Sequence, residues 1–446
     1  MKTTITTKGR GTWRLFVLAA VLAVFAGCGN PWMRSILAPF YPEENAGYPL
    51  HMTVYVDPGG NDNNNGLSPG IGNALETVDE ALLRIKQAYS AGSWPGRGGS
   101  SPPPAAAKII IEGTITAGSG TDGMVDISDG GIYAAYPPII LAGTGPGELD
   151  ATTMSKRVLY VENADVTLES GLELFGGNDN DGGGVYVTNG KFTMNGGFIR
   201  NNSTTASGGG GVFVTNNGIF NMNGGTIENH ISITRGGGVY VHSGQFNMSG
   251  DAKILNNTVS DDGGGVYVHS GNFNMSGGTI GGSTTPNTAN HGAGVYISGG
   301  NFSMSGDAKI HYNEITPITG GDGGGVYFSG SGNFSMSGNA SISYNLIPST
   351  SSGSGGGVYA AGGGTFDMNG GTISGNTANN NGGGVYITNS GNFTKSGGFI
   401  YGSPDSSQNT AVGGSGHAVF FNGAPGLNKD NNVEPSHTFN GAIWTP

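Results

Sequence analysis

The sequence predicts an all-β protein, a single right-handed parallel β-helix solenoid of three-stranded coils with a short N-terminal α-helical cap. Three observations predict this fold. A Gly-Gly-Gly-Val-Tyr-Val element or a close variant recurs along the chain, successive copies lie 27 to 34 residues apart, and each copy holds three short stretches of alternating apolar and polar residues. Repeats of this length are typical of solenoids, and alternation with a period of two is typical of half-buried strands.

The repeat is clearest at residues 236–257, which read Gly-Gly-Gly-Val-Tyr-Val, a polar link, Phe-Asn-Met, a glycine-centred turn and Lys-Ile-Leu-Asn-Asn. One coil cannot bury its own apolar face, but coils stacked about 4.8 Å apart pair each strand with its counterparts above and below. We therefore expect one interior ladder of valines and another of phenylalanines. The valines are Val185, Val212, Val239, Val266, Val295, Val326, Val358, Val385 and Val419, and the phenylalanines are Phe192, Phe220, Phe246, Phe273, Phe302, Phe334, Phe366 and Phe393.

Residues 1–27 are predicted to be a lipoprotein signal peptide. Four basic residues precede an apolar run at 15–26 that is short for a bilayer span, and Phe-Ala-Gly-Cys at 25–28 resembles the bacterial lipobox. The resemblance implies that Cys28 is the lipid attachment site, with an unmodified cysteine beside an ordinary cleavage site as the alternative. Cys28 is the only cysteine, so the chain has no intrachain disulfide and no cysteine metal site.

The lipoprotein resemblance implies an exported protein that is anchored to the outer membrane through its lipid and displayed on the cell surface. Gly29 follows the cysteine, whereas an aspartate there is the usual signal for inner-membrane retention. The membrane leaflet is left open. Residues 28–50, rich in proline and asparagine, are predicted to form a flexible tether.

Residues 51–180 are predicted to contain the N-terminal cap and irregular first coils, and residues 181–446 the regular repeats with a C-terminal coil. Thr77 and Glu80 form a capping-box pattern at a helix start. An amphipathic helix at this place can cover the open end of the solenoid and shield its first strand edge. The apolar face of this helix is expected to hold Val78, Leu82, Ile85 and Tyr89.

The opening Tyr-Val-Asp-Pro-Gly-Gly-Asn-Asp at 55–62, together with the helix, resembles the start of proteins of the pectate-lyase-like superfamily. The repeats are similar to those of polymorphic outer membrane proteins, whose signature pairs a Gly-Gly-aliphatic element with an aromatic-x-x-Asn element. Here the first element matches, but the asparagine follows isoleucine instead, as at 254–257 and 310–313. The resemblance implies the fold rather than one activity, because this fold hosts lyases, hydrolases, adhesins and passive stalks.

The main functional hypothesis is a non-catalytic adhesin-like or structural surface protein, and the alternative is a polysaccharide lyase or glycoside hydrolase of the same fold. Lyases of the superfamily use an arginine base and calcium-binding carboxylates, whereas its hydrolases group aspartates and a histidine. Arg200 and Arg235 are the only arginines after residue 180. Asp181, Asp262 and Asp322 precede the glycine corner in three copies, but other residue types hold that place elsewhere, so we predict no catalytic residue and no cofactor.

Three polar stretches could suggest a metal site. Residues 61–66 alternate oxygen-bearing side chains as a calcium loop does, but Gly72 stands where the closing glutamate would be. Residues 176–181 resemble a calcium-binding nonapeptide repeat that occurs only once. His242 and His269 follow the same strand in adjacent copies. We interpret these features as polar turns and a polar ladder, and predict no metal.

The residue between the valines of Val-Tyr-Val is expected to point outward and to form an external aromatic stripe. Such a stripe can stack on sugar rings, or it can simply stabilise neighbouring strands by packing. The candidate binding surface consists of Tyr186, Phe213, Tyr240, Tyr267, Tyr296, Tyr327, Tyr359 and Tyr386.

The link from isoleucine to the next valine is the second candidate surface. It varies from 12 to 19 residues, whereas the other two links always span 7 or 8. Loops at this corner are expected along one edge, where they either carry recognition or vary because nothing constrains them. The longest lie at 203–207, 283–291, 315–322, 347–354 and 404–412.

The charge balance restricts the partners. The chain carries a net charge of −12, and residues 1–27 hold four basic and no acidic residues, so the remainder carries −16. Such a chain repels phosphate backbones, which argues against nucleic acid. The predicted partners are the membrane, through the lipid, and a host matrix protein or a polysaccharide.

Overall fold

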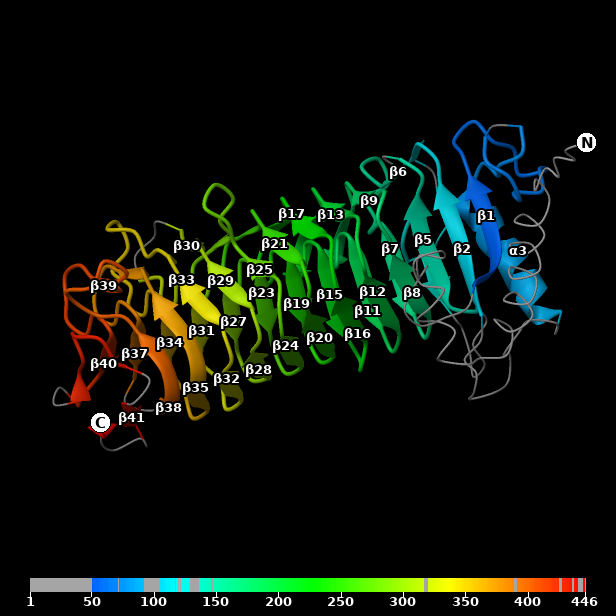
Figure 1. Ribbon diagram of the computed structural model, residues 1–446. Helices are drawn as coiled ribbons and strands as arrows, with labels where there is room; N and C mark the ends of the chain where they lie inside the picture. The colour runs from blue at the N-terminus through cyan, green and yellow to red at the C-terminus, as the bar shows by residue number, and fades with distance from the viewer. Residues whose placement is uncertain are drawn as a thin grey trace, which may run out of the picture. The chain divides into compact units, whose positions relative to one another are not determined.

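The chain is an all-β parallel β-solenoid of about ten turns (Figure 1). The computed structural model describes residues 50–70, 72–91, 105–116, 118, 120, 122–128, 136–145, 147–316, 320–388, 391–424, 427–434, 437–439 and 444–445. Residues 50–446 form one compact unit. The predicted signal peptide, the tether up to residue 49 and Cys28 lie outside the described residues. No helix of the described part is long and apolar enough to cross a membrane.

The Val-Tyr-Val elements form an eleven-stranded parallel sheet in which successive coils pair residue for residue. Val185 lies opposite Val212, which lies opposite Val239. The strands are β4 (Val125–Ser128), β7 (Leu159–Glu162), β11 (Val185–Thr188), β15 (Val212–Thr215), β19 (Val239–Val241), β23 (Val266–Val268), β27 (Val295–Ile297), β31 (Val326–Phe328), β34 (Val358–Ala360), β37 (Val385–Ile387) and β40 (Val419–Phe421).

The Phe-x-Met and isoleucine stretches form the two ladders of a 23-stranded sheet. Its strands are β1 (Leu50–Val56), β2 (Ala106–Ile111), β3 (Thr114–Ile115), β5 (Ile139–Gly143), β6 (Gly147–Asp150), β8 (Asp165–Leu168), β9 (Leu172–Phe175), β12 (Lys191–Met194), β13 (Phe198–Arg200), β16 (Ile219–Met222), β17 (Thr226–Glu228), β20 (Gln245–Met248), β21 (Lys253–Leu255), β24 (Asn272–Met275), β25 (Thr279–Ile280), β28 (Asn301–Met304), β29 (Lys309–His311), β32 (Asn333–Met336), β33 (Ser341–Ser343), β35 (Thr365–Ser374), β38 (Asn392–Ile400), β41 (Thr438–Phe439) and β42 (Trp444–Thr445).

The two predicted ladders lie in the interior. The nine valines and eight phenylalanines are all fully buried in one continuous core, as the alternation predicts. Neighbouring phenylalanine rings stack with centroids 4.6 to 5.4 Å apart. Burial of one large apolar side chain contributes roughly 1.5 to 3 kcal/mol, so these ladders are a major source of stability.

Many coils contain a fourth short strand, which the sequence did not predict. It lies in the variable link after the isoleucine strand and has its own small core, in which Val259, Ala289 and Ile315 are buried. Most of these strands have only two residues, which are too few for alternation to be recognised in the sequence. These strands are β10 (Asn178–Asp181), β14 (Ser203–Gly208), β18 (Ile231–Ser232), β22 (Thr258–Val259), β26 (Thr288–Ala289), β30 (Glu314–Ile315), β36 (Thr377–Ala378) and β39 (Thr410–Ala411).

A ladder of buried asparagines closes the turn between the isoleucine strand and the fourth strand. Each side-chain amide except the last, that of Asn409, donates to the Oδ1 atom of the asparagine in the next coil, at 2.8 to 2.9 Å. All six amides donate to the carbonyl of an isoleucine in the preceding coil. This pairing explains why asparagine follows isoleucine in the repeat, since a buried amide needs partners on both sides. The ladder comprises Asn257, Asn287, Asn313, Asn345, Asn376 and Asn409.

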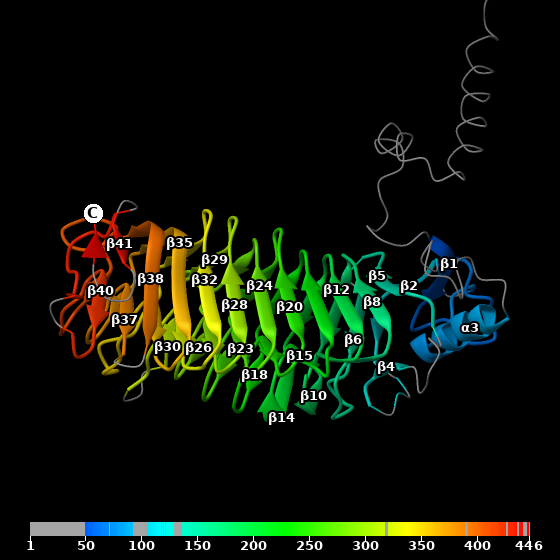
Figure 2. The ribbon, with the colours of Figure 1, turned by 90° about the horizontal axis from the view of Figure 1, so that it is seen from below.

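Helix α3 (Val78–Ser90) lies beside β1 and β2 at the N-terminal end of the described chain (Figure 2). The Thr77 hydroxyl accepts a hydrogen bond from the Glu80 N–H at 3.2 Å, so Thr77 is the N-cap that the capping-box pattern predicts. The predicted apolar face is buried and belongs to the main core. At the other end the chain turns back, and β41 pairs with β38 in the antiparallel direction.

Candidate binding surface

The eight predicted aromatic residues form one ladder outside the main core. They occupy the middle position of successive strands from β11 to β37, and Phe213, Tyr240 and Tyr267 form an apolar cluster of their own. Neighbouring ring centroids lie 4.9 to 5.1 Å apart along the whole ladder. The rings therefore repeat with the spacing of the coils.

The ladder is more enclosed than an external stripe would be. Phe213, Tyr240 and Tyr267 are only 3 to 5% exposed, and the other five residues are half-buried. Each ring is covered by its neighbours, and the corner glycines lie against the ladder: a Cβ atom on Gly236 would lie 2.9 Å from the Cβ atom of Tyr240. The half-buried tyrosines thus present edges and hydroxyl groups rather than open ring faces.

Burial also keeps the phenols neutral. Desolvation raises the pKa of Tyr240 and of Tyr296 to about 12. For Tyr296, a hydrogen bond with Ser329, whose hydroxyl lies 3.2 Å from the phenol, opposes this rise in pKa. Neutral phenols both donate and accept hydrogen bonds at physiological pH. The exposed edge of the ladder can therefore bind the hydroxyl or amide groups of a partner.

A polar ladder runs beside the aromatic one, at the position before each glycine corner. Arg235 pairs with Asp262 and Asp262 pairs with His291 as neighbours in parallel register. Asp322 lies one coil further on, and its carbonyl accepts the Gly292 N–H at 3.1 Å. The sequence correctly places the acidic residues apart, because His291 separates Asp262 from Asp322. The four residues nevertheless occupy equivalent positions on successive coils, which their different residue types hide in the sequence.

The two carboxyl groups of this polar ladder have raised pKa values. Burial raises the pKa of Asp262 to about 6, with the Asp261 carboxylate adding to the rise and Arg235 opposing it. Burial likewise raises the pKa of Asp322 to about 6, although the Ser354 N–H donates to its Oδ1 atom at 2.7 Å. Burial lowers the pKa of His291, whose Nδ1 atom accepts the Asp322 N–H at 3.1 Å. Acids of this kind can transfer protons near neutral pH.

Arg157 and Tyr160 extend the surface, and the sequence analysis did not single them out. The Arg157 guanidinium lies 4.4 Å from the centroid of the Tyr186 ring and 5.6 Å from that of Tyr160, and its Nε atom is 3.1 Å from the Asp179 carboxylate. Tyr160 could have been found, because Leu-Tyr-Val at 159–161 aligns with Val-Tyr-Val one coil later. This copy is recognisable in the sequence as a degenerate one without the glycine signature, but its tyrosine was not included in the predicted stripe.

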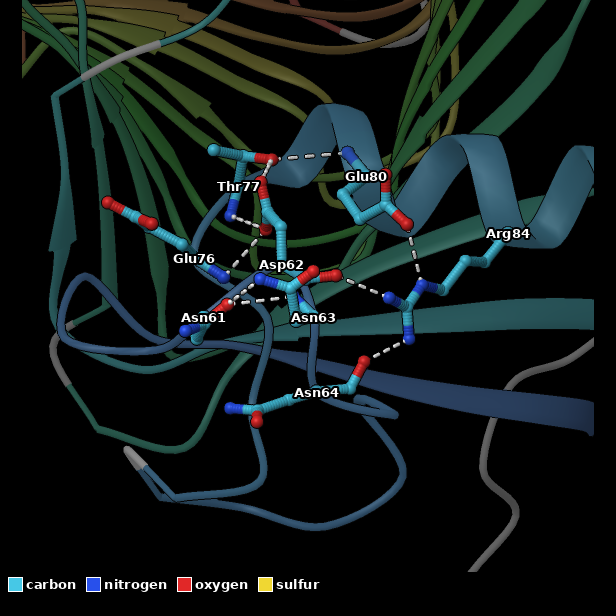
Figure 3. Close-up of polar contacts among 8 residues, drawn as sticks. All are labelled: Asn61, Asp62, Asn63, Asn64, Glu76, Thr77, Glu80 and Arg84. Carbon is cyan, nitrogen blue, oxygen red and sulfur yellow. Dashed lines mark hydrogen bonds and ion pairs between the residues drawn. The ribbon is translucent and has the colours of Figure 1, made fainter.

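The asparagine-rich turn at 61–66 is hydrogen-bonded to the start of helix α3 (Figure 3). The Asp62 carboxylate accepts hydrogen bonds from the N–H groups of Glu76 and Thr77, at 2.9 and 3.0 Å, and from the Thr77 hydroxyl at 2.9 Å. The Arg84 guanidinium donates to the carbonyl oxygens of Asp62 and Asn64. The Oδ1 atoms of Asn61 and Asn65 accept the N–H groups of Asn63 and Leu67, at 2.8 and 2.9 Å, as asparagines that stabilise a turn do.

The other candidate metal stretches also have structural partners. Residues 178–181 form strand β10, and Asp179 within it pairs with Arg157. The rings of His242 and His269 stack in parallel with centroids 5.1 Å apart, as a polar ladder would. Within the described residues no group of three or more histidine, cysteine, aspartate or glutamate side chains could hold a metal ion.

The variable loops are partly ordered by the fourth strand. Residues 203–207 lie in β14, residues 283–291 contain β26, and residues 404–412 contain β39. The loop at 315–322 begins in β30, and its residues 317–319 lie outside the described part. In the loop at 347–354, Ile347 is buried in the small core. These loops therefore contribute to the fold as well as to the surface.

Comparison with known proteins identifies no relative. No protein-family model, curated protein or solved structure matches the chain. The structure is that of a parallel β-solenoid protein. The resemblance to the pectate-lyase-like superfamily rests on the sequence motifs alone.

Proposed function

We propose that the chain is a non-catalytic adhesin-like or structural protein of the cell surface, which binds a polysaccharide or a host matrix protein. The observation that supports this best is the outward aromatic ladder, whose rings repeat about every coil at 4.9 to 5.1 Å. Solenoids present extended surfaces of repeated groups, and such surfaces suit long or multivalent partners.

The proposal includes the location. Cys28 carries a lipid that anchors the chain to the outer membrane, and residues 28–50 are the tether that holds the solenoid at the surface. Membrane fractionation of cells that express the wild type or Cys28→Ala tests this part. The variant is expected in the soluble fraction, and its continued attachment to membranes would refute lipid anchoring.

The proposal also includes the finer description of the fold. We infer a right-handed winding, since parallel strands joined by crossovers adopt that hand almost always. Helix α3 is inferred to act as the N-terminal cap, because its buried residues belong to the same core as β1 and β2. Relationship to the pectate-lyase-like superfamily and to polymorphic outer membrane protein repeats is part of the same proposal.

A polysaccharide hydrolase or lyase is the second candidate, and the row Asp262, His291 and Asp322 favours it. Residues two coils apart are separated by about 9.6 Å, near the upper end of the separation between the two carboxyl groups of inverting glycosidases. Release of reducing or unsaturated ends from a polysaccharide, abolished by Asp262→Asn and Asp322→Asn, would establish this alternative.

A further inference from the structure

Tyr312 and Tyr344 occupy equivalent turn positions on neighbouring coils, and the backbone there is unfavourable for tyrosine. Each lies directly before a buried ladder asparagine and has a positive φ, of 53° and 55°. Left-handed backbone suits asparagine and glycine, which can adopt it at little cost, and disfavours bulky side chains. The equivalent positions in other coils follow this rule and hold Asn201, Asn229, Asn256 and Gly375.

The two rings are placed for contact with a partner rather than for burial. Tyr312 is 36% exposed and Tyr344 is 47% exposed, and their rings stack with centroids 5.1 Å apart and planes 10° apart. A Cβ atom on Gly375 would lie 2.6 Å from two carbons of the Tyr344 ring, so this ring packs on Gly375 of the next coil as well as on Tyr312, and the pair offers ring edges and hydroxyl groups to a partner. Leu346, which is 37% exposed, lies two residues further along.

Longer turns border this pair on both sides. The ladder asparagine follows isoleucine by three residues at 310–313, 342–345 and 373–376, but by seven at 280–287 and by nine at 400–409. Three short turns, two of which carry the tyrosines, therefore lie between two longer ones. The Gly375 N–H donates to the Ser407 carbonyl of the following longer turn at 2.8 Å, so this turn directly adjoins the short ones.

The chemistry of the pair suits an uncharged sugar. The exposed part of each tyrosine offers an apolar ring edge and a hydroxyl, which can contact the C–H bonds and the hydroxyl groups of a pyranose. The neighbouring His311 ring lies 5.0 Å from that of Tyr312, and burial lowers the pKa of His311, so it is neutral at pH 7. The net charge of −12 disfavours polyanions.

We propose that Tyr312 and Tyr344 form a binding site for a neutral polysaccharide, whose C–H and hydroxyl groups contact the exposed ring edges and the phenol hydroxyls of the pair. This site rests on the proposed surface-binding function and names its ligand class. It lies at the asparagine-ladder turn, whereas the outward aromatic ladder lies on the Val-Tyr-Val strands, so the two surfaces can be altered separately.

Affinity electrophoresis of the full chain in non-ionic detergent, through native gels containing laminarin, xyloglucan, dextran or hydroxyethyl cellulose, tests the proposal. The wild type is expected to be retarded in at least one gel. The double variant Tyr312→Asn with Tyr344→Asn should bind at least about tenfold more weakly, because it loses two aromatic contacts with the ligand. The variant should still fold, because asparagine suits the backbone of this turn. The double phenylalanine variant, which keeps the rings, should retain most of the retardation.

Phe198→Thr is the matched control and should leave the retardation unchanged, because Phe198 is an exposed aromatic residue of β13 outside both surfaces and aligns with Thr226 in the next coil. Equal retardation of the wild type and the double asparagine variant would refute the site. If Tyr386→Asn in the outward ladder then weakened binding, polysaccharide binding would stand and move to that ladder. If the wild type were retarded in none of the gels, the site would be refuted. Binding to collagen- or fibronectin-coated plates would then decide separately whether the proposed surface function survives.

Discussion

The Nδ1 atom of His230 accepts a hydrogen bond from the backbone N–H of Asn202 at 3.0 Å, so one buried histidine takes part in the asparagine ladder. Its Nε2 atom lies 2.9 Å from the carbonyl oxygen of Ile199 and must donate, because a carbonyl only accepts. The imidazole therefore replaces the asparagine amide in its neutral Nε2–H form. Full burial lowers the pKa of His230 to about 4.

This histidine predicts a loss of stability in acid. The pKa in the folded state lies below the ordinary value of 6.5, so the unfolded chain binds the proton more readily. The stabilisation is present above pH 6.5 and is lost as the pH falls toward 4, by about 3 kcal/mol in all. Urea unfolding at pH 7, 5.5 and 4.5 should show this loss in the wild type. His230→Asn restores the usual ladder residue and should reduce the loss, whereas equal pH dependence in both proteins would refute the assignment.

Asp262 and Asp322 have the opposite dependence on pH. Their raised pKa values of about 6 mean that the folded state binds protons more readily, so this contribution to stability is present below pH 4 and is lost as the pH rises to 6. Asp322→Asn should therefore stabilise the chain at pH 7, by about 1 kcal/mol after allowance for solvent screening, and have little effect at pH 3.5. Denaturant midpoints at the two pH values measure this difference. A destabilised variant at pH 7 would show that the ionised carboxylate is needed.

The strand ladders could be predicted because the same residue type recurs at each level. The sequence shows Val-Tyr-Val and Phe-x-Met with short, constant links, and the structure places those residues in register. The role of the asparagines was not predicted. A polar residue within one repeat gives no sign of burial, because its partners lie in neighbouring coils, as Asn287 does for Asn257.

The phenylalanine ladder gives a direct test of the core. Phe273 is fully buried, with ring centroids 4.6 and 4.8 Å from those of Phe246 and Phe302. Phe273→Ala should lower the free energy of unfolding by about 3 to 5 kcal/mol, and Phe273→Asp should prevent stable folding by burying a charge. Thermal melts followed by circular dichroism measure both. A loss below about 1 kcal/mol for the alanine variant would contradict the position of the ring.

Replacement of Tyr344 separates stability from binding. Asparagine tolerates the left-handed backbone that Tyr344 adopts, so Tyr344→Asn should raise the free energy of unfolding by up to about 1 kcal/mol, after allowance for the lost stacking with Tyr312. The control is Asn256→Tyr, which should be destabilising by a similar amount at the equivalent position. Loss of stability in Tyr344→Asn would show that the ring is a structural element.

The surface was harder to predict than the core. The outward direction of Tyr240 follows from alternation, but its near-complete burial depends on the neighbouring rings and on Gly236, which the spacing alone does not reveal. The polar row at Arg235, Asp262 and His291 looked irregular because its residue types change from coil to coil. Ladder positions can thus be recognised in a sequence when the same residue type recurs in each coil. They are hidden when different residue types occupy the equivalent position.

The central claim is that the chain is a binding protein rather than an enzyme. It is tested most directly by measuring whether the chain cleaves a polysaccharide that it binds. The purified full chain would be incubated with each gel polysaccharide and with polygalacturonate, and the chain length and new reducing or unsaturated ends of the polymer would be measured. The account predicts that the polymer is bound, keeps its length and gains no new ends. Shortened polymer with the wild type, and intact polymer with Asp262→Asn or Asp322→Asn, would contradict it.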